Sequence, residues 1–171
     1  MEFYDILVKR RSIRAYKNKP IPEDTLLKIL EAARLAQSAT NRQPWRFIII
    51  QDETNRKKVA ELCTGNNWAA DASVILAGVA VDTKYRMGNG RPASDIDLSI
   101  ALTQISLAAV DQSLGTCWIG SFKYNEAMAY MKIPKDNILV GFMTLGYPDE
   151  SPSEKSRKPM EEIIVHEFWN E

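Results

Sequence analysis

The sequence predicts an α+β fold in which residues 1–171 form a single domain. A length of 171 residues is typical of one domain and is large enough to bury a sizeable core. Segments with helical periodicity alternate with about four short, apolar, strand-like segments. No internal repeat or linker divides the chain, and its 45% hydrophobic and 26% charged residues are typical of a globular protein.

The longest helical pattern is apolar nearly all round. This segment, residues 97–114, is expected to lie buried at the centre of the fold. Ser94 and Asp97 have the spacing of a capping box, which would place the start of the helix here. Gly115 fits the glycine position that follows a helix end. The predicted helices span residues 2–9, 23–36, 53–62, 97–114 and 124–131.

Strands are predicted where short segments are rich in β-branched and aromatic residues, over residues 45–50, 116–120 and 138–147. Residues 73–81 are almost continuously apolar, which suits either a strand covered on both faces or a buried helix. The polar segments 37–44, 83–93 and 148–160 are expected loops.

An apolar tail, residues 161–168, follows the last polar connection. It has no obvious core of its own to enter, and we expect it to be extended. Such a segment can add a strand to the sheet of a partner, which would make the protein a dimer.

Composition and missing motifs exclude several classes of function. The 22 basic residues balance 22 acidic ones, so a general nucleic-acid binder is not expected. No apolar run reaches about 18 residues and the N-terminus lacks a signal-peptide pattern, so we expect a cytoplasmic protein without a membrane span. Cys63 and Cys117 form no CxxC pair and are expected to be buried, reduced thiols. With His166 as the single histidine, neither a histidine-based metal site nor a Ser-His-Asp triad is expected.

Four polar clusters remain as candidates for chemistry, and each has a simpler structural explanation. Arg10, Arg11, Ser12 and Arg14 offer charge-assisted donors to a phosphate, or form a solvated basic turn. A second basic cluster, residues 155–158, is either a further anion contact or a solvated loop.

The other two clusters lie next to predicted strands. Ser38, Asn41 and Gln43 precede Trp45 and suit the polar edge of a planar heterocycle, or serve only in turns. In residues 114–120 the glycines allow backbone to approach a ligand closely, or mark only a helix end before a strand.

Taken together, the segments RRSIR, SATNRQPW, LAAVDQSLGTCWIG and GYPDESPSEKSRKP resemble the nitroreductase family of FMN flavoproteins. They occur in the family's order from about residue 3 to residue 165, and the length resembles the family's compact branch. The resemblance implies a mostly antiparallel sheet flanked by helices. It also implies an intertwined homodimer with exchanged C-terminal tails and two FMN sites, each built by both chains.

The resemblance assigns roles to individual residues. Arg10 and Ser12 would face the FMN phosphate, and Arg14 the ribityl chain or pyrimidine edge. The segment containing Ser38 would lie beside the flavin, partly across the dimer interface, and the backbone near Gly120 would lie against N5. The expected cofactor-binding residues are Arg10, Arg11, Ser12, Arg14, Ser38, Asn41, Gln43, Asn67, Trp118, Ile119, Gly120, Lys155 and Arg157.

The implied activity is an oxidoreductase that takes a hydride from NADH or NADPH onto FMN. Electrons would pass on to a nitroaromatic, a quinone or a similar small acceptor by a ping-pong mechanism, without a side-chain acid or base. The alternatives are a specialised flavin enzyme of the same fold, of the dehalogenase or flavin-cleaving type, and a non-enzymatic FMN carrier or sensor. Gln37, Ser113 and Gly120 depart from common family residues, which leaves the donor and the acceptor open.

Overall fold

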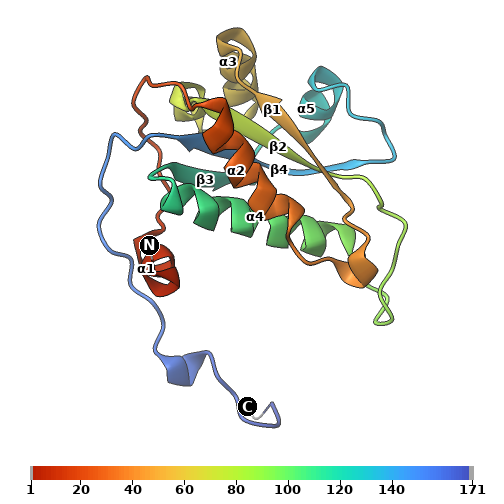
Figure 1. Ribbon diagram of the computed structural model, residues 1–171. Coiled ribbons are helices and arrows are strands. Elements are labelled where there is room, and N and C mark those ends of the chain that lie inside the picture. The colour runs from red at the N-terminus through yellow and green to blue at the C-terminus, as the bar shows by residue number, and fades with distance from the viewer. Residues whose placement is uncertain (1, 170–171) are drawn as a thin grey trace.

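A four-stranded antiparallel sheet forms the centre of the computed structural model, which describes residues 2–169 (Figure 1). The strands are β1 (Trp45–Ile50), β2 (Val74–Ala80), β3 (Gly115–Ile119) and β4 (Ile138–Gly146), in the order β1-β2-β4-β3. All neighbouring strands are antiparallel, so the predicted α+β class and antiparallel sheet are confirmed. Every residue of β2 is buried, which explains why its pattern did not separate a strand from a buried helix.

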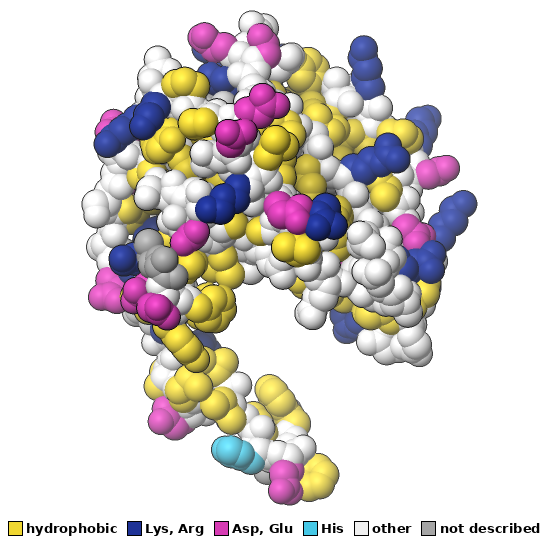
Figure 2. All heavy atoms as spheres, viewed as in Figure 1, with side chains coloured by type: hydrophobic (Ala, Val, Ile, Leu, Met, Phe, Trp, Pro, Cys, Tyr) yellow, Lys and Arg dark blue, Asp and Glu magenta, His cyan; other side chains and the backbone are white. Residues whose placement is uncertain are grey.

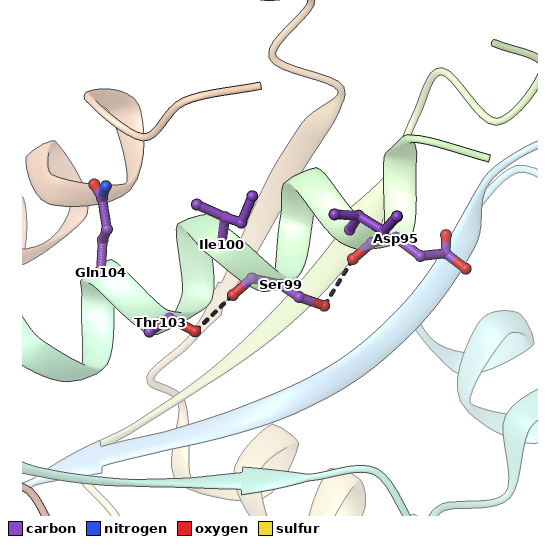
Figure 3. Close-up of a pocket in the computed structure, with 6 residues that line it drawn as sticks. Asp95, Ser99, Ile100, Thr103 and Gln104 are labelled. Carbon is purple, nitrogen blue, oxygen red and sulfur yellow. Dashed lines mark hydrogen bonds between the residues drawn. The ribbon is translucent and has the colours of Figure 1, made fainter. Parts of the chain in front are cut away.

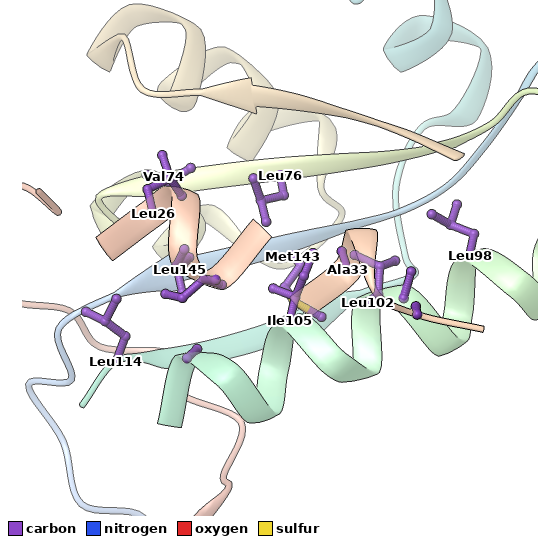
Figure 4. Packing of buried hydrophobic residues seen from close by; sticks show 14 of the residues in the cluster. Leu26, Ala33, Val74, Leu76, Leu98, Leu102, Ile105, Leu114, Met143 and Leu145 are labelled. Carbon is purple, nitrogen blue, oxygen red and sulfur yellow. The ribbon is translucent and has the colours of Figure 1, made fainter. Parts of the chain in front are cut away.

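Helices cover both faces of the sheet (Figure 1). α2 (Glu23–Arg34) and α4 (Ser94–Asp111) pack on one face, and α3 (Glu53–Leu62) and α5 (Tyr124–Tyr130) on the other. Alternate side chains of β2 enter the two layers, as strand geometry requires. Figure 4 shows the first layer, in which burial of each large aliphatic side chain contributes about 1.5–3 kcal/mol. Its fully buried members include Ile29, Leu76, Leu98, Leu102, Ile105 and Leu145.

The ends of α4 differ from the prediction, since the helix starts at Ser94 and not at residue 97. The predicted capping box is wrong. Ala93 is the N-cap residue, and the Ser94 hydroxyl donates to the Asp95 carboxylate at 3.2 Å. Asp97 turns instead toward Ala39, whose backbone N–H it accepts at 3.1 Å. A tertiary contact has therefore replaced the local cap.

The C-terminal end of α4 is closed by Ser113 and not by Gly115. Ser113 has a φ of 59°, the left-handed conformation of a residue just past a helix end. The N–H of Leu114 then donates to the carbonyl of Ala109 at 2.8 Å, and that of Ser113 to Val110 at 3.0 Å. This is the hydrogen-bond pattern of a Schellman motif. Gly115 begins β3 and allows Ile13 to approach, because a Cβ there would lie 2.8 Å from the Ile13 Cβ.

The two chain ends expose apolar side chains. The first helix, α1 (Phe3–Lys9), buries none of its residues. The tail contains a short 3-10 turn, η3 (Met160–Glu162), where a wholly extended segment was expected, and its apolar side chains lie in solvent. Figure 2 shows this apolar tail projecting from the body of the protein. Within residues 2–169 the tail joins no sheet, so its exchange with a partner stays a prediction.

The two cysteines are free and buried, as predicted. Burial raises the pKa of the Cys63 thiol to about 12. Among residues 2–169, no helix combines the length and the apolar character needed to cross a bilayer. In the same residues no group of three or more metal-ligating side chains is found.

Candidate functional site

The first part of the site is the N-terminal segment that lies beside β3, an edge strand of the sheet. Ser12 forms a parallel bridge with Thr116, and the N–H of Ile13 donates to the Thr116 carbonyl at 2.9 Å. Backbone groups alternate in direction along a strand, so the backbone N–H and carbonyl of Trp118 also face this edge. In the described chain no further strand pairs here. Gly120 itself lies just past β3, whose predicted end was one residue too late.

Three of the predicted cofactor-binding residues, Arg10, Ser12 and Arg14, lie near the start of this edge. Burial raises the pKa of the Cys117 thiol, and the Arg14 cation, a hydrogen bond with Ser12 and the Arg10 cation oppose that rise. The Ser12–Thr116 bridge keeps the segment that carries these three residues beside the start of β3. The Arg14 guanidinium is also 5.9 Å from the centre of the Trp68 ring.

Arg11 behaves differently from its neighbours. Its guanidinium donates to the carbonyl of Val8 and, at 3.0 Å, to the carbonyl of Arg10. Its Nε atom is buried and has no hydrogen-bond partner among the described residues. Backbone carbonyls of neighbouring residues therefore hold part of this guanidinium. The role of Arg11 toward the cofactor stays a prediction.

The chain that follows β4 fixes this segment from its other side, a contact that sequence reasoning missed. The Glu150 carboxylate accepts the backbone N–H groups of Arg14 and, at 3.2 Å, of Ala15. The N–H of Asp149 donates to the Ala15 carbonyl at 2.9 Å.

Asn67 begins the 3-10 helix η2 (Asn67–Asp71), which carries the Trp68 that faces Arg14. The structure thus places Asn67 on an element that borders the arginine cluster.

The second part of the site is the loop between α2 and β1, where Ser38, Asn41 and Gln43 contact one another. The Ser38 hydroxyl accepts the Gln43 N–H at 2.9 Å, and the Gln43 amide donates to the Asn41 side chain at 3.2 Å. Thr40, Asn41 and Gln43 have φ values of 51°, 56° and 52°. Such strained backbone persists where surrounding contacts fix it, and it is frequent at functional sites.

Asp97 and Arg42 hold this loop to the rest of the chain. Asp97 is 3% exposed, and while its Oδ1 accepts the N–H of Ala39, its Oδ2 has no partner among the described residues. Arg42 forms an ion pair of 2.6 Å with Asp82, and its guanidinium is 4.4 Å from the centre of the Tyr85 ring. The sequence signal for Asp97 was a carboxylate within an otherwise apolar helix.

These two parts lie at opposite ends of α4. We call residues 10–14 with the open edge of β3 the arginine end, and residues 38–43 the loop end. A helix rises about 1.5 Å per residue, so Asp97 and Asp111 are about 21 Å apart along α4, which is longer than a tricyclic flavin ring. Figure 1 shows the two ends separated by this helix. The single chain therefore does not bring the two groups of predicted residues together.

The remaining predicted residues, Lys155 and Arg157, are exposed. The guanidinium of Arg157 donates to the neighbouring Ser156 carbonyl at 2.9 Å. In Figure 1 the segment after β4 runs past α1 and away from the sheet. Their return to a phosphate stays a prediction.

An apolar groove lies on the outward face of α4, with a volume of about 530 Å³. Figure 3 shows that its hydroxyl groups turn back to the helix, where Ser99 donates to the Asp95 carbonyl and Thr103 to the Ser99 carbonyl. Ile96 and Ile100 remain as its apolar surface. The groove presents an apolar contact face and no cluster of reactive groups.

Comparison with known proteins agrees with this architecture. The Nitroreductase family model matches residues 7–78 and 65–147. A protein of Archaeoglobus fulgidus, provisionally named NADH dehydrogenase/NAD(P)H nitroreductase, is 33% identical over 87% of both chains. The FMN reductase [NAD(P)H] of Bacillus subtilis is 31% identical over 95% of this chain and 72% of its own length. A nitroreductase family protein from Clostridium novyi superposes with a TM-score of 0.83 at 31% identity, over 91% of this chain and 89% of that one. The chain has the nitroreductase fold and belongs to the nitroreductase family.

Proposed function

We propose that this protein is a single-domain, homodimeric, FMN-dependent oxidoreductase that uses NADH or NADPH to reduce a nitroaromatic, a quinone or a similar small acceptor. The observation that carries the proposal is the arginine end, where the Ser12–Thr116 bridge and the hydrogen bond from Ile13 hold the segment with Arg10, Ser12 and Arg14 along the open edge of β3. The name of the Bacillus subtilis relative, FMN reductase [NAD(P)H], supports the choice of cofactor and donor.

The donors at the arginine end fit the chemistry of FMN. A phosphate is held best by charge-assisted donors, which Arg10 and the Ser12 hydroxyl supply. The outward N–H of Trp118 suits the polar edge of a planar ring, and we assign the N–H of Gly120, just past β3, to the region of N5. A fixed cation such as Arg14 favours the negative charge that develops near flavin N1 and the C2 carbonyl on reduction. Arg11 and Asn67 lie near these groups and stay proposed contacts. Ile119 stays a proposed contact through its backbone, because its side chain is buried in the core.

FMN held by Arg10, Ser12 and Arg14 would supply the redox chemistry, as a carrier that takes two electrons as a hydride from the nicotinamide donor and gives them to the acceptor, with protons from solvent. The protein's own tasks are to bind, orient and stabilise charge. No side chain needs to act as a general acid or base for the hydride step. This agrees with the composition of the arginine end, which has cations, a hydroxyl and backbone donors.

The separation of the two ends supports a dimer. In a two-fold arrangement, the arginine end of one subunit can meet the loop end of its partner, so that Ser38, Asn41 and Gln43 reach the flavin from across the interface. Apolar side chains on α1, the α4 groove and the tail are available to form that interface. Exchange of the tails would also allow Lys155 and Arg157 to return to the phosphate.

The visible absorbance spectrum of the purified protein tests the cofactor and the donor. We expect flavin bands that bleach without oxygen on addition of NADH or NADPH and return when an acceptor is added. Absence of flavin bands after incubation with FMN would refute the proposal. Bands that persist with both donors would refute the oxidoreductase and favour a carrier.

Co-expression of two damaged chains tests the shared site. One chain carries Arg10→Ala and Arg14→Ala, and the other carries Asn41→Gly and Gln43→Gly, in which glycine adds no strain at a positive φ. Each homodimer should lose FMN binding. Random pairing makes half of the dimers mixed, each with one intact site, so about a quarter of all sites should recover. No recovery would show that each site lies within one chain.

A further inference from the structure

The loop before α4 is an ordered hairpin that carries three cations. Arg86 and Pro92 form an antiparallel bridge, and the N–H of Met87 donates to the Arg91 carbonyl at 2.9 Å. Lys84, Arg86 and Arg91 are exposed. Among the described residues none of the three forms an ion pair with a carboxylate. In a chain with zero net charge, this hairpin concentrates unpaired positive charge.

The hairpin is fixed beside the loop end of the site. Arg42, which belongs to the loop end, pairs with Asp82 at the base of the hairpin and stacks on Tyr85 within it. The carboxylate of Asp82 is thus already paired with Arg42. On the other side of the base, the Thr83 hydroxyl donates to the Asp136 carbonyl at 2.9 Å. These contacts join the base of the hairpin to the loop end.

We infer that Lys84, Arg86 and Arg91 bind the 2′-phosphate of the nicotinamide donor and make the enzyme prefer NADPH over NADH. Guanidinium groups hold phosphates through paired hydrogen bonds, and the 2′-phosphate is the group that distinguishes NADPH from NADH. The inference rests on the proposed function, because the hairpin borders the flavin only where the loop end completes the site. An anionic acceptor would use the same chemistry, so the donor and the acceptor must be tested separately.

Binding of adenosine 2′,5′-bisphosphate and of AMP to the FMN-loaded protein, measured by calorimetry, gives a first test that needs no turnover. Loss of a charge-assisted phosphate contact changes affinity by about 10- to 100-fold. We expect the bisphosphate to bind tighter than AMP by a factor in that range, and the difference to shrink as salt is added. Equal binding of the two nucleotides would overturn the inference.

A triple variant, Lys84→Gln, Arg86→Gln and Arg91→Gln, tests the residues themselves. The ratio of kcat/KM for NADPH to that for NADH should fall about tenfold or more, with kcat at saturating NADH unchanged. Lys28→Gln, Lys57→Gln and Lys58→Gln on α2 and α3 form a matched control, since they remove the same charge from exposed positions away from the hairpin. A ratio that is unchanged in the hairpin variant, or that falls equally in the control, would overturn the inference.

Two further outcomes separate this inference from the proposed function. If neither donor bleaches the flavin while the bisphosphate still binds through the hairpin, the oxidoreductase is refuted and the phosphate site stands. If the hairpin variant keeps its preference for NADPH but loses turnover of a carboxylated acceptor relative to a neutral one, the cations serve the acceptor. The assignment to the donor is then wrong.

Discussion

The arginine end and the loop end of α4 are built in different ways. The arginine end joins three distant stretches of chain, residues 10–16, β3 and residues 147–150, through backbone hydrogen bonds and close packing. The loop end is one short stretch whose shape depends on side chains, chiefly Ser38, Asp97 and Arg42. The arginine end should therefore be sensitive to added volume, and the loop end to lost hydrogen bonds.

The largest effect is expected from Gly115→Ala at the arginine end. The new Cβ would lie 2.8 Å from the Ile13 Cβ and 3.1 Å from the Pro148 Cγ, so the N-terminal segment must move away from β3. Overpacking of this kind costs about 1–3 kcal/mol of stability. We expect FMN affinity, followed by flavin fluorescence, to fall about tenfold or more, because the segment carries Arg10 and Ser12.

Gly88→Ala is the matched control, since a Cβ added there would meet no atom within 4 Å and the φ of Gly88 is not left-handed. It should leave urea unfolding and FMN affinity unchanged. Equal behaviour of the two alanine variants would show that close packing at Gly115 does not position the arginine end.

A comparable loss of stability is expected from Asp97→Ala at the loop end. The variant leaves the N–H of Ala39 without its partner, which costs about 1–3 kcal/mol. The unfolding free energy should fall, and limited proteolysis should begin within residues 38–43. Asp97→Asn keeps an oxygen at the position of Oδ1 and should retain most of the stability. If the asparagine variant is as unstable as the alanine variant, the hydrogen bond to Ala39 is not what holds the loop.

The same contrast explains what the sequence could predict. The pattern of apolar residues located the five α-helices and the four strands, although for β2, which is buried on both faces, it did not separate a strand from a buried helix. The start of α4 was misjudged because Ser94 and Asp97 carry a local capping signal that the contact with Ala39 overrides. Glu150 and Trp68 escaped notice because their contacts with Arg14 depend on the folded chain. The separation of the two ends depends on where α4 lies in the folded chain. The sequence alone therefore did not show that the two groups of site residues need a partner chain to meet.

The smallest effect is expected from Ser113→Gly, at the junction of α4 and β3. Ser113 holds a φ of 59°, a conformation that glycine adopts without steric strain. Glycine loses more entropy than serine on folding, but relief of the backbone strain outweighs this loss. We therefore expect the free energy of unfolding, measured with urea, to rise by about 0.5–1 kcal/mol. Gln112→Gly, one residue earlier with a φ of −91°, relieves no such strain and should lower stability. If both variants destabilise the protein, strain at Ser113 is absent and the hydrogen bonds of Leu114 and Ser113 alone close the helix. If Ser113→Gly stabilises the protein while FMN affinity stays constant, the arginine end is set by the packing of Ile13 on β3 and not by the turn that precedes it.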